Sequence, residues 1–268
     1  MSIALPSLEE LARERISAGN IELPVFPSSA NEVLALCEST DVDAKELADV
    51  IRCDATLAGH FLAIANSAAF GGGRSPLVTL QQALTRLGLL QTKQIAIVIA
   101  CKTRAFVVPD RPERAEELLG HAFATALFAQ EIARARRLNV EEAFLAGLLH
   151  DIGEPAVLQV CAEVQRSSGR FFDTREIDDC VERHHEELGG MIARAWKMRG
   201  PIVEAIAAHH DAPRKHTVAI VQLADALAQG ERDLARHPAS DVLNLYPEDV
   251  AHLVARVAKL SDRTQEAA

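Results

Sequence analysis

The sequence predicts an all-α protein, and three observations support this fold class. Helix-capping signatures recur along the chain, apolar residues repeat at helical intervals, and the two-residue alternation typical of half-buried strands is missing from the sequence. With 268 residues, of which 49% are hydrophobic, the chain is long enough to bury a sizeable core. We therefore expect a helical bundle of two lobes.

Helix starts in the first third of the chain are marked by a capping signature. In this signature a Ser, Thr or Asp and a Glu or Gln three residues later satisfy free N–H groups of the first turn. It is found at Ser7 with Glu10, Ser29 with Glu32, Asp43 with Glu46 and Thr79 with Gln82. Asp54 is expected to cap a helix over residues 55–70, which three consecutive glycines end. Gly88 is expected to end the helix after Thr79, before a further helix over residues 89–106.

Residues 107–112 contain two prolines, which prevent a helix from continuing through this segment. We expect the segment to separate an N-terminal helical lobe, residues 21–108, from a second lobe, residues 113–230. Gly153 is expected to end a helix that includes His150. The helices expected after the boundary cover residues 113–137, 141–150, 155–166, 176–183, 185–198, 201–210, 216–229 and 248–260. Residues 231–268 are expected to form a C-terminal helical extension.

Composition argues against several classes of protein. The net charge is −10, with 28 basic against 38 acidic residues, so the chain lacks the basic excess typical of nucleic-acid binders. No run of about 18 apolar residues predicts a membrane span, and the N-terminus does not resemble a signal peptide. Five cysteines without C-x-x-C spacing are expected to be small buried residues in a reducing compartment. We predict a cytoplasmic protein.

Histidines and carboxylates in otherwise apolar helices form the candidate site. His150 and Asp151 are adjacent at a helix end, where an imidazole nitrogen and a carboxylate oxygen suit a divalent transition metal. Glu117 precedes His121 by four residues, so both lie on one helix face. Asp225 lies in an apolar helix, where a carboxylate is costly unless it is paired or binds a cation. The full set expected in one cleft is Glu117, His121, His150, Asp151, His185, His209, His210 and Asp225.

The nitrogen and oxygen ligands in this set do not choose among Fe, Mn and Zn. One alternative is that the cleft holds a structural metal. Another is that it holds none, with the polar residues paired among themselves.

The order of these residues resembles the HD superfamily, whose members place a His, a His-Asp pair and a late Asp around divalent metal on a helical bundle. Two branches are similar, the HD-GYP phosphodiesterases of cyclic-di-GMP and the HDOD family, the HD-related output domain of bacterial signalling proteins. The N-terminal half resembles HDOD over the segments 23–27, 51–57, 64–70 and 83–88. The resemblance covers about residues 21–230 and implies an HD-like C-terminal lobe.

The HDOD resemblance implies a bacterial regulatory protein of signal transduction that acts by protein–protein contacts without catalysis. Its implied partners are signalling proteins, and a nucleotide second messenger is a further ligand that the resemblance allows. Glu154 stands where HD-GYP enzymes have a lysine, and residues 212–215 replace their Gly-Tyr-Pro element. The alternative is a metal-dependent phosphohydrolase of cyclic-di-GMP or another nucleotide, in which Asp151 would bridge two metals.

Overall fold

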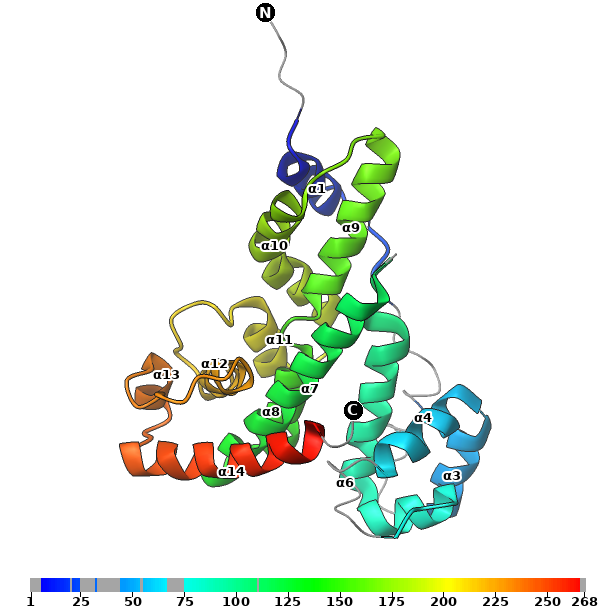
Figure 1. The fold of residues 1–268 in the computed structure, drawn as a ribbon, viewed down its shortest axis with the longest axis vertical. Coiled ribbons are helices and arrows are strands. Elements are labelled where there is room, and N and C mark those ends of the chain that lie inside the picture. Colours follow the sequence, from blue (N-terminus) through cyan, green and yellow to red (C-terminus); the bar gives the residue numbers. More distant parts are fainter. Residues whose placement is uncertain are drawn as a thin grey trace, which may run out of the picture. The chain divides into compact units, whose positions relative to one another are not determined.

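The computed structural model describes residues 6–19, 21–24, 32, 44–53, 55–66, 75–109 and 111–265. Within these ranges the regular structure is helical and no strand occurs, which confirms the all-α fold class (Figure 1). The chain divides into two compact units. One consists of Met1–Val25 and Ala105–Leu245, and the other of Phe26–Arg104 and Tyr246–Ala268.

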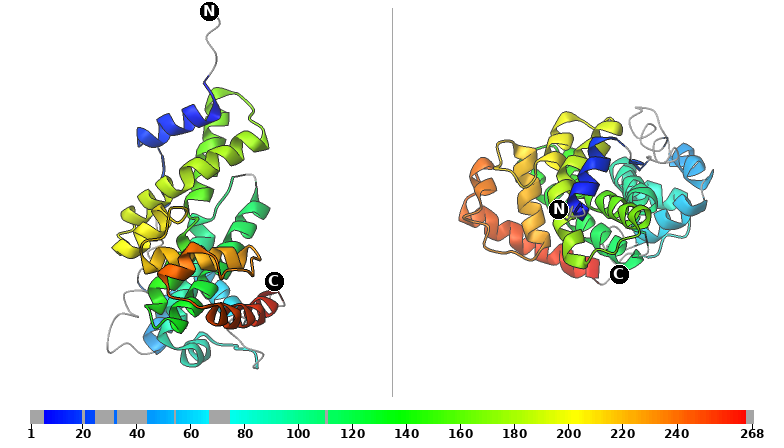
Figure 2. Two further views of the ribbon diagram at one scale, coloured as in Figure 1. Left: turned by 90° about the vertical axis from the view of Figure 1, so that its left-hand side faces the viewer. Right: turned by 90° about the horizontal axis from the view of Figure 1, so that it is seen from above.

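The helices of the first unit pack closely (Figure 2). They are α1 (Leu8–Ser17), α7 (Pro112–Ala135), α8 (Val140–Leu149), α9 (Gly153–Ser168), α10 (Thr174–Ala195), α11 (Gly200–Ala207), α12 (His216–Ala228) and α13 (Pro238–Val242). α7 packs against α8 and α12, and α9 packs against α10. Gly147 of α8 permits the first contact, because a Cβ atom there would lie 2.9 Å from the Cα atom of Ala126 in α7.

The core of the second unit lies among three helices. The helices of this unit are α3 (Ala44–Cys53), α4 (Ala55–Asn66), α6 (Leu80–Ala100) and α14 (Pro247–Gln265). Ile51 of α3, Phe61 of α4 and Ile95 of α6 are fully buried in one apolar cluster. A π-helical turn over Cys101–Ala105 follows α6. Burial of these apolar side chains stabilises the unit.

Gly88 interrupts α6, as the sequence predicts. Its φ of 75° lies in the left-handed region, and the backbone there is not helical. The stretch Leu80–Thr103 is long and apolar enough to cross a membrane, although 53% of its most apolar window is buried inside the protein. Length and composition are weak support for a membrane span here, because the core helix of a globular protein has the same properties.

Two of the predicted capping sites are confirmed. Ser7 and Glu10 form a reciprocal capping box at the start of α1. Thr79 accepts a hydrogen bond from the Gln82 N–H at the start of α6. The other predicted caps, Ser29, Asp43 and Asp54, lie outside the described residues, as does the glycine turn at 71–73.

Helix α10 is longer than the sequence predicts. It runs without interruption from Thr174 to Ala195, and the prediction of two helices, over residues 176–183 and 185–198, is wrong. The histidine pair inside α10 interrupts the apolar pattern, but histidine does not break a helix backbone. A capping box of Asp173 with Glu176 starts the helix.

Gly153 begins α9, so the prediction that it ends the preceding helix is wrong. α8 already ends at Leu149, and residues 150–152 form a turn. A Cβ atom on Gly153 would lie only 1.8 Å from the carbonyl oxygen of His185 in α10. The glycine is therefore required for the close approach of α9 to α10.

The division of the chain into residues 21–108, 113–230 and 231–268 stays a prediction. In the structure α1 packs against α9 and α10 of the first unit, although it precedes residue 21. α13 also belongs to the first unit, whereas α14 belongs to the second. The predicted C-terminal extension is thus divided between the two units.

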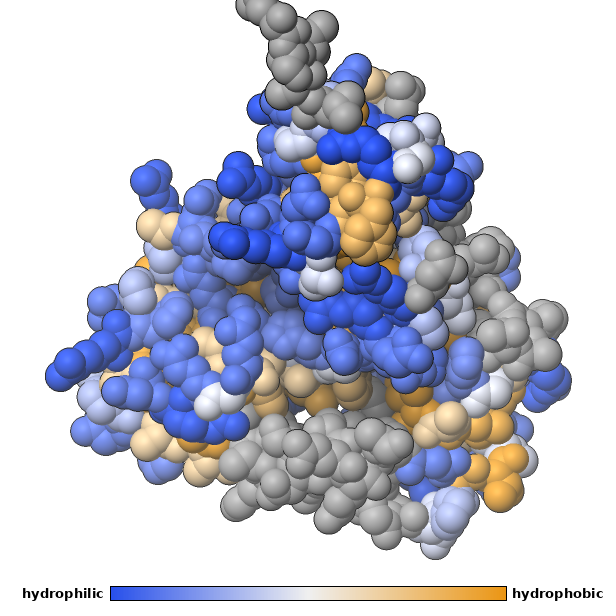
Figure 3. All heavy atoms as spheres, turned by 45° about the horizontal axis from the view of Figure 1, so that its top comes forward, coloured by the Kyte–Doolittle hydropathy of each residue, from blue (hydrophilic) through white to orange (hydrophobic). Residues whose placement is uncertain are grey.

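The face of the molecule drawn in Figure 3 is mainly hydrophilic. Apolar residues form smaller areas on this face. Phe171 is a large apolar side chain that remains exposed. Cys101, Cys161 and Cys180 are buried free thiols, in line with the packing role that the sequence predicts.

Candidate metal centre

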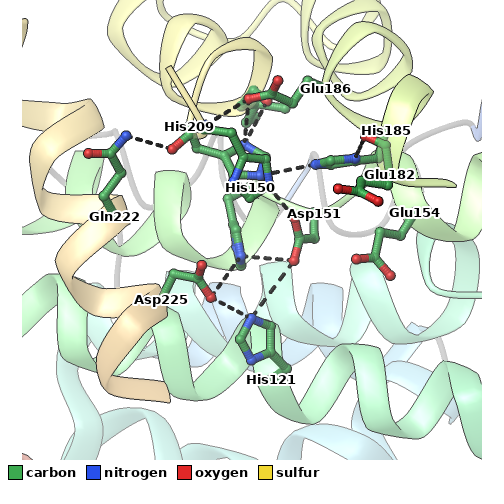
Figure 4. Close-up of polar contacts among 12 residues, drawn as sticks. His121, His150, Asp151, Glu154, Glu182, His185, Glu186, His209, Gln222 and Asp225 are labelled. Carbon is green, nitrogen blue, oxygen red and sulfur yellow. Dashed lines mark hydrogen bonds and ion pairs between the residues drawn. The ribbon is translucent and has the colours of Figure 1, made fainter. Parts of the chain in front are cut away.

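The first histidine group consists of His121, His150, Asp151 and Asp225 (Figure 4). His121 lies on α7, His150 and Asp151 follow α8, and Asp225 lies on α12. Nε2 of His121 is 2.9 Å from Oδ1 of Asp225. Nε2 of His150 is 2.9 Å from Oδ2 of Asp151. The packing of α7 against α8 and α12 therefore brings two imidazoles and two carboxylates to one point.

The second histidine group consists of His185, His209 and His210. His185 lies on α10, and the other two lie in the turn after α11. Nε2 of His185 is 3.3 Å from Nε2 of His209. Asp151 joins the two groups, because its Oδ1 atom is 3.2 Å from Nε2 of His209 while its Oδ2 atom faces His150. One carboxylate thus presents one oxygen to each group.

Backbone carbonyls fix a hydrogen on the Nδ1 atom of three imidazoles. The Nδ1 atom of His150 lies 2.9 Å from the carbonyl oxygen of Gly147, that of His185 lies 3.0 Å from the oxygen of Val181, and that of His209 lies 3.1 Å from the oxygen of Ile206. A carbonyl oxygen only accepts, so each Nδ1 donates its hydrogen and each Nε2 keeps a lone pair in the neutral ring. This is the arrangement in which protein histidines bind metals through Nε2.

The contacts at Nε2 fit a divalent metal. With neutral rings, the facing Nε2 atoms of His185 and His209 would direct two lone pairs at each other, which is unfavourable without a cation or a proton between them. Nε2 of His150 is buried and makes no hydrogen bond with good geometry. Two ligands on an ion with bonds of about 2.1 Å lie about 3.0 Å apart at right angles and farther apart at wider angles. The contacts between the candidate ligand atoms here span 2.9 to 3.8 Å.

Without a bound metal ion, the two carboxylates of the first group would favour a proton on His150. Burial opposes the charged form of His150, but Asp151 and Asp225 outweigh burial and raise the pKa of His150 well above its ordinary value. Burial acts to raise the pKa of Asp151, yet His150 and His209 hold it well below its usual range. The two carboxylates therefore require a positive partner, which is either this proton or a metal ion.

Two residues that the sequence reasoning missed hold the turn with His209 and His210. Glu186 on α10 accepts a hydrogen bond from the His210 N–H at 2.9 Å. Gln222 on α12 donates to the carbonyl oxygens of His209, at 2.7 Å, and Asp211, at 2.6 Å. Gln222 precedes Asp225 by three residues in an otherwise apolar helix. This spacing places both polar side chains on one helix face and indicates that Gln222 lies near the site.

Glu117 lies apart from the two groups among the described residues. Its side chain is 68% exposed and pairs with Arg114 at 3.4 Å. Glu117 and His121 lie one turn apart on α7, but the Glu117 carboxylate is directed toward Arg114. The structure thus brings together every predicted ligand except Glu117, whose role as a ligand stays a prediction.

An open cleft of about 550 Å³ gives access to both groups. Its lining includes Asp151, His185, His210 and Asp225 from the candidate metal centre. It also includes the charged side chains Arg111, Arg114, Glu154, Asp178 and Glu182. A ligand of nucleotide size could therefore reach the candidate metal centre.

Comparison with known families identifies the fold. A family model described as the HDOD domain matches residues 23–212. The chain belongs to the HDOD family. An HDOD domain protein of unknown function from Geobacter sulfurreducens is 24% identical, with a TM-score of 0.71 over 97% of this chain and 98% of that one. At this identity the likeness shows the shared fold alone.

Two further solved HDOD-like folds carry functional names. A chain from Shewanella amazonensis, provisionally named a metal-dependent phosphohydrolase, is 22% identical with a TM-score of 0.68, over 91% of this chain and 95% of that one. A chain from Marinobacter aquaeolei, provisionally named a signal transduction protein, is 21% identical with a TM-score of 0.68, over 98% of this chain and 61% of that one.

Curated relatives are longer than this HDOD chain. An uncharacterized protein of Treponema pallidum is 24% identical over 82% of this chain, which spans 45% of that relative. Ribonuclease Y of Syntrophotalea carbinolica is 33% identical over 47% of this chain and 20% of its own length. The chain therefore spans less than half of either relative.

Proposed function

We propose that this HDOD protein is a metal-binding regulatory protein of bacterial signal transduction that acts through contacts with signalling proteins. The observation that carries the metal-binding part is the position of Asp151 between the two histidine groups, with one oxygen toward each. The regulatory part is supported by membership of the HDOD family and by the signal transduction name of one structural neighbour.

The candidate metal centre has enough ligands for two ions. His121, His150 and Asp225 would hold one ion, while His185, His209 and His210 would hold the other, with Asp151 shared. A bound divalent ion would act as a Lewis acid toward a phosphate oxygen. Histidine and carboxylate ligands suit Fe, Mn and Zn alike.

A metal-dependent phosphohydrolase is the second candidate, because the shared Asp151 resembles the bridging carboxylate of two-metal sites. Two features weigh against it. Glu154 stands at the mouth of the site where the related enzymes have a lysine, and the chain as a whole carries a net charge of −10. We therefore expect negligible hydrolysis of cyclic-di-GMP.

Metal analysis of protein purified without chelator tests the proposal. We expect the wild type to retain Fe, Mn or Zn, and His150→Ala with Asp151→Ala to lose it. His252→Ala is the matched control, because His252 is exposed on α14 of the other unit. A wild type without stoichiometric metal would contradict the proposal. Turnover of cyclic-di-GMP at ~1 s⁻¹ or faster would favour the hydrolase instead.

A further inference from the structure

We propose that Arg111 and Arg114 bind phosphate at the cleft beside the candidate metal centre, so that the cleft takes a small phosphate-bearing ligand. The inference rests on the proposed function, because it assigns a ligand class to the same site. Both arginines line the cleft that also exposes Asp151 and His210. A guanidinium with its planar set of donors suits phosphate recognition.

Arg114 is anchored at the cleft by ion pairs on two sides. Its guanidinium lies 3.3 Å from Glu154, whose side chain is only 19% exposed, and 3.4 Å from Glu117. Burial and the nearby Asp151 charge raise the pKa of Glu154, while Arg114 acts in the opposite direction. Arg114 therefore partly compensates the charge of Glu154, which stands in the lysine position of related enzymes, and it brings guanidinium donors from α7 to the same place.

The cleft presents two arginines among several carboxylates. Its lining includes Asp151, Glu154, Asp178, Glu182 and Asp225, which would repel an anion wherever no cation offsets them. Arg111 and Arg114, at the start of α7, would attract it. The cleft volume of about 550 Å³ lies within the range of small-molecule sites, so the cleft is large enough for a mononucleotide. The ligand is therefore expected to carry its phosphate near the arginines and the metal centre.

Calorimetric titration with inorganic phosphate tests this assignment, using both metal-loaded and chelator-treated protein. Arg114→Gln is expected to weaken phosphate binding about tenfold or more, since a charge-assisted hydrogen bond is lost. Arg111→Gln is expected to weaken phosphate binding by a smaller factor. The ion pairs with Glu117 and Glu154 hold the Arg114 side chain in place, and neither of these pairs involves Arg111. Arg13→Gln is the matched control, an exposed arginine of α1 paired with Glu9 outside the cleft lining.

Equal phosphate affinity in Arg114→Gln and Arg13→Gln would overturn the proposal, as would undetectable phosphate binding in both forms of the wild type. The metal content of the same samples reports separately on the proposed function. Loss of phosphate affinity in Arg114→Gln at unchanged metal content and unchanged helical circular dichroism would support the assignment. A wild type without metal, in which Arg114→Gln still weakens phosphate binding, would contradict only the proposed function.

Discussion

At the scale of single residues, the charge state of the candidate metal centre depends on whether a proton or a metal ion lies beside the carboxylates of Asp151 and Asp225. Without a metal ion, the two carboxylates favour a proton on His150, because they raise the pKa of its imidazole. A metal ion would replace that proton, because only the neutral imidazole nitrogen is a ligand. Proton and metal therefore compete for the same nitrogen atom.

We predict opposite pH dependences of the free energy of unfolding for metal-free and metal-loaded protein. In metal-free protein, the contribution of charged His150 is fully present below its unfolded pKa of about 6.5 and is lost as pH rises through the raised folded pKa. In metal-loaded protein, protons displace the ion as pH falls below about 6. Urea unfolding between about pH 5.5 and 9, with and without chelator, measures both. Metal-free protein that gained stability from pH 6 to 9 would contradict this account.

Gly153→Ala is predicted to lower the free energy of unfolding by about 1–3 kcal/mol or more, because overpacking typically costs this much. It is also predicted to lower the metal content of the protein. A Cβ atom would lie 1.8 Å from the backbone of His185, so α9 must move away from α10. Gly120→Ala of α7 is the matched control, because a Cβ atom there meets nothing within 4 Å. Thermal unfolding of both variants gives the comparison, and equal stability would show that the close approach is unimportant.

Much of the site could be predicted at the residue scale, because histidines and carboxylates are conspicuous in apolar helices. His121, His150, Asp151 and Asp225 are placed together as the sequence predicts. The direction of the Glu117 side chain could not be predicted, since spacing on a helix does not show that Arg114 competes for the same carboxylate. Contacts between distant segments decide such pairings.

At the scale of helices, α10 depends on its N-terminal cap. Asp173 accepts from the Glu176 N–H at 2.9 Å, and the Glu176 side chain accepts from the Asp173 N–H at 3.0 Å. Asp173 and Glu176 do not line the cleft, although Thr174 between them does, and His185 lies in the middle of the helix. Loss of the cap should therefore affect stability more than the site.

Asp173→Ala is predicted to lower the free energy of unfolding by about 1 kcal/mol, the usual cost of losing a capping side chain. Metal content should stay that of the wild type, because the cap contacts none of the candidate ligands in the described chain. Urea unfolding and metal analysis provide the two readouts. Ser7→Ala, which removes the corresponding cap of α1, is the comparison variant. An unchanged unfolding midpoint for Asp173→Ala would contradict the assigned role of the cap.

The existence of helices could be predicted more reliably than their ends. Capping signatures and apolar spacing depend on residues close in sequence, which explains the correct starts of α1 and α6. The sequence does not show the continuity of α10, because two buried histidines replace apolar residues in its pattern. The role of Gly153 is also hidden in the sequence, because it is a tertiary contact with the backbone of another helix.

At the scale of the whole molecule, the candidate metal centre belongs entirely to the first unit. Its residues come from α7, α10 and α12 and from the turns after α8 and α11. The packing of these helices positions the imidazoles, and Glu186 and Gln222 hold the turn that carries His209 and His210. The first unit alone therefore supplies a nearly complete ligand set.

Anomalous diffraction from crystals of chelator-free protein tests the central claim most directly. The account predicts anomalous peaks at about 2.0–2.3 Å from Nε2 of His150 and of His185, with Asp151 as a shared ligand. Peaks in both histidine groups would establish a metal centre built as described. Well-ordered crystals with no anomalous peak, in which His150 Nε2 and Asp151 keep a 2.9 Å contact, would contradict the claim and leave a proton as the only positive partner.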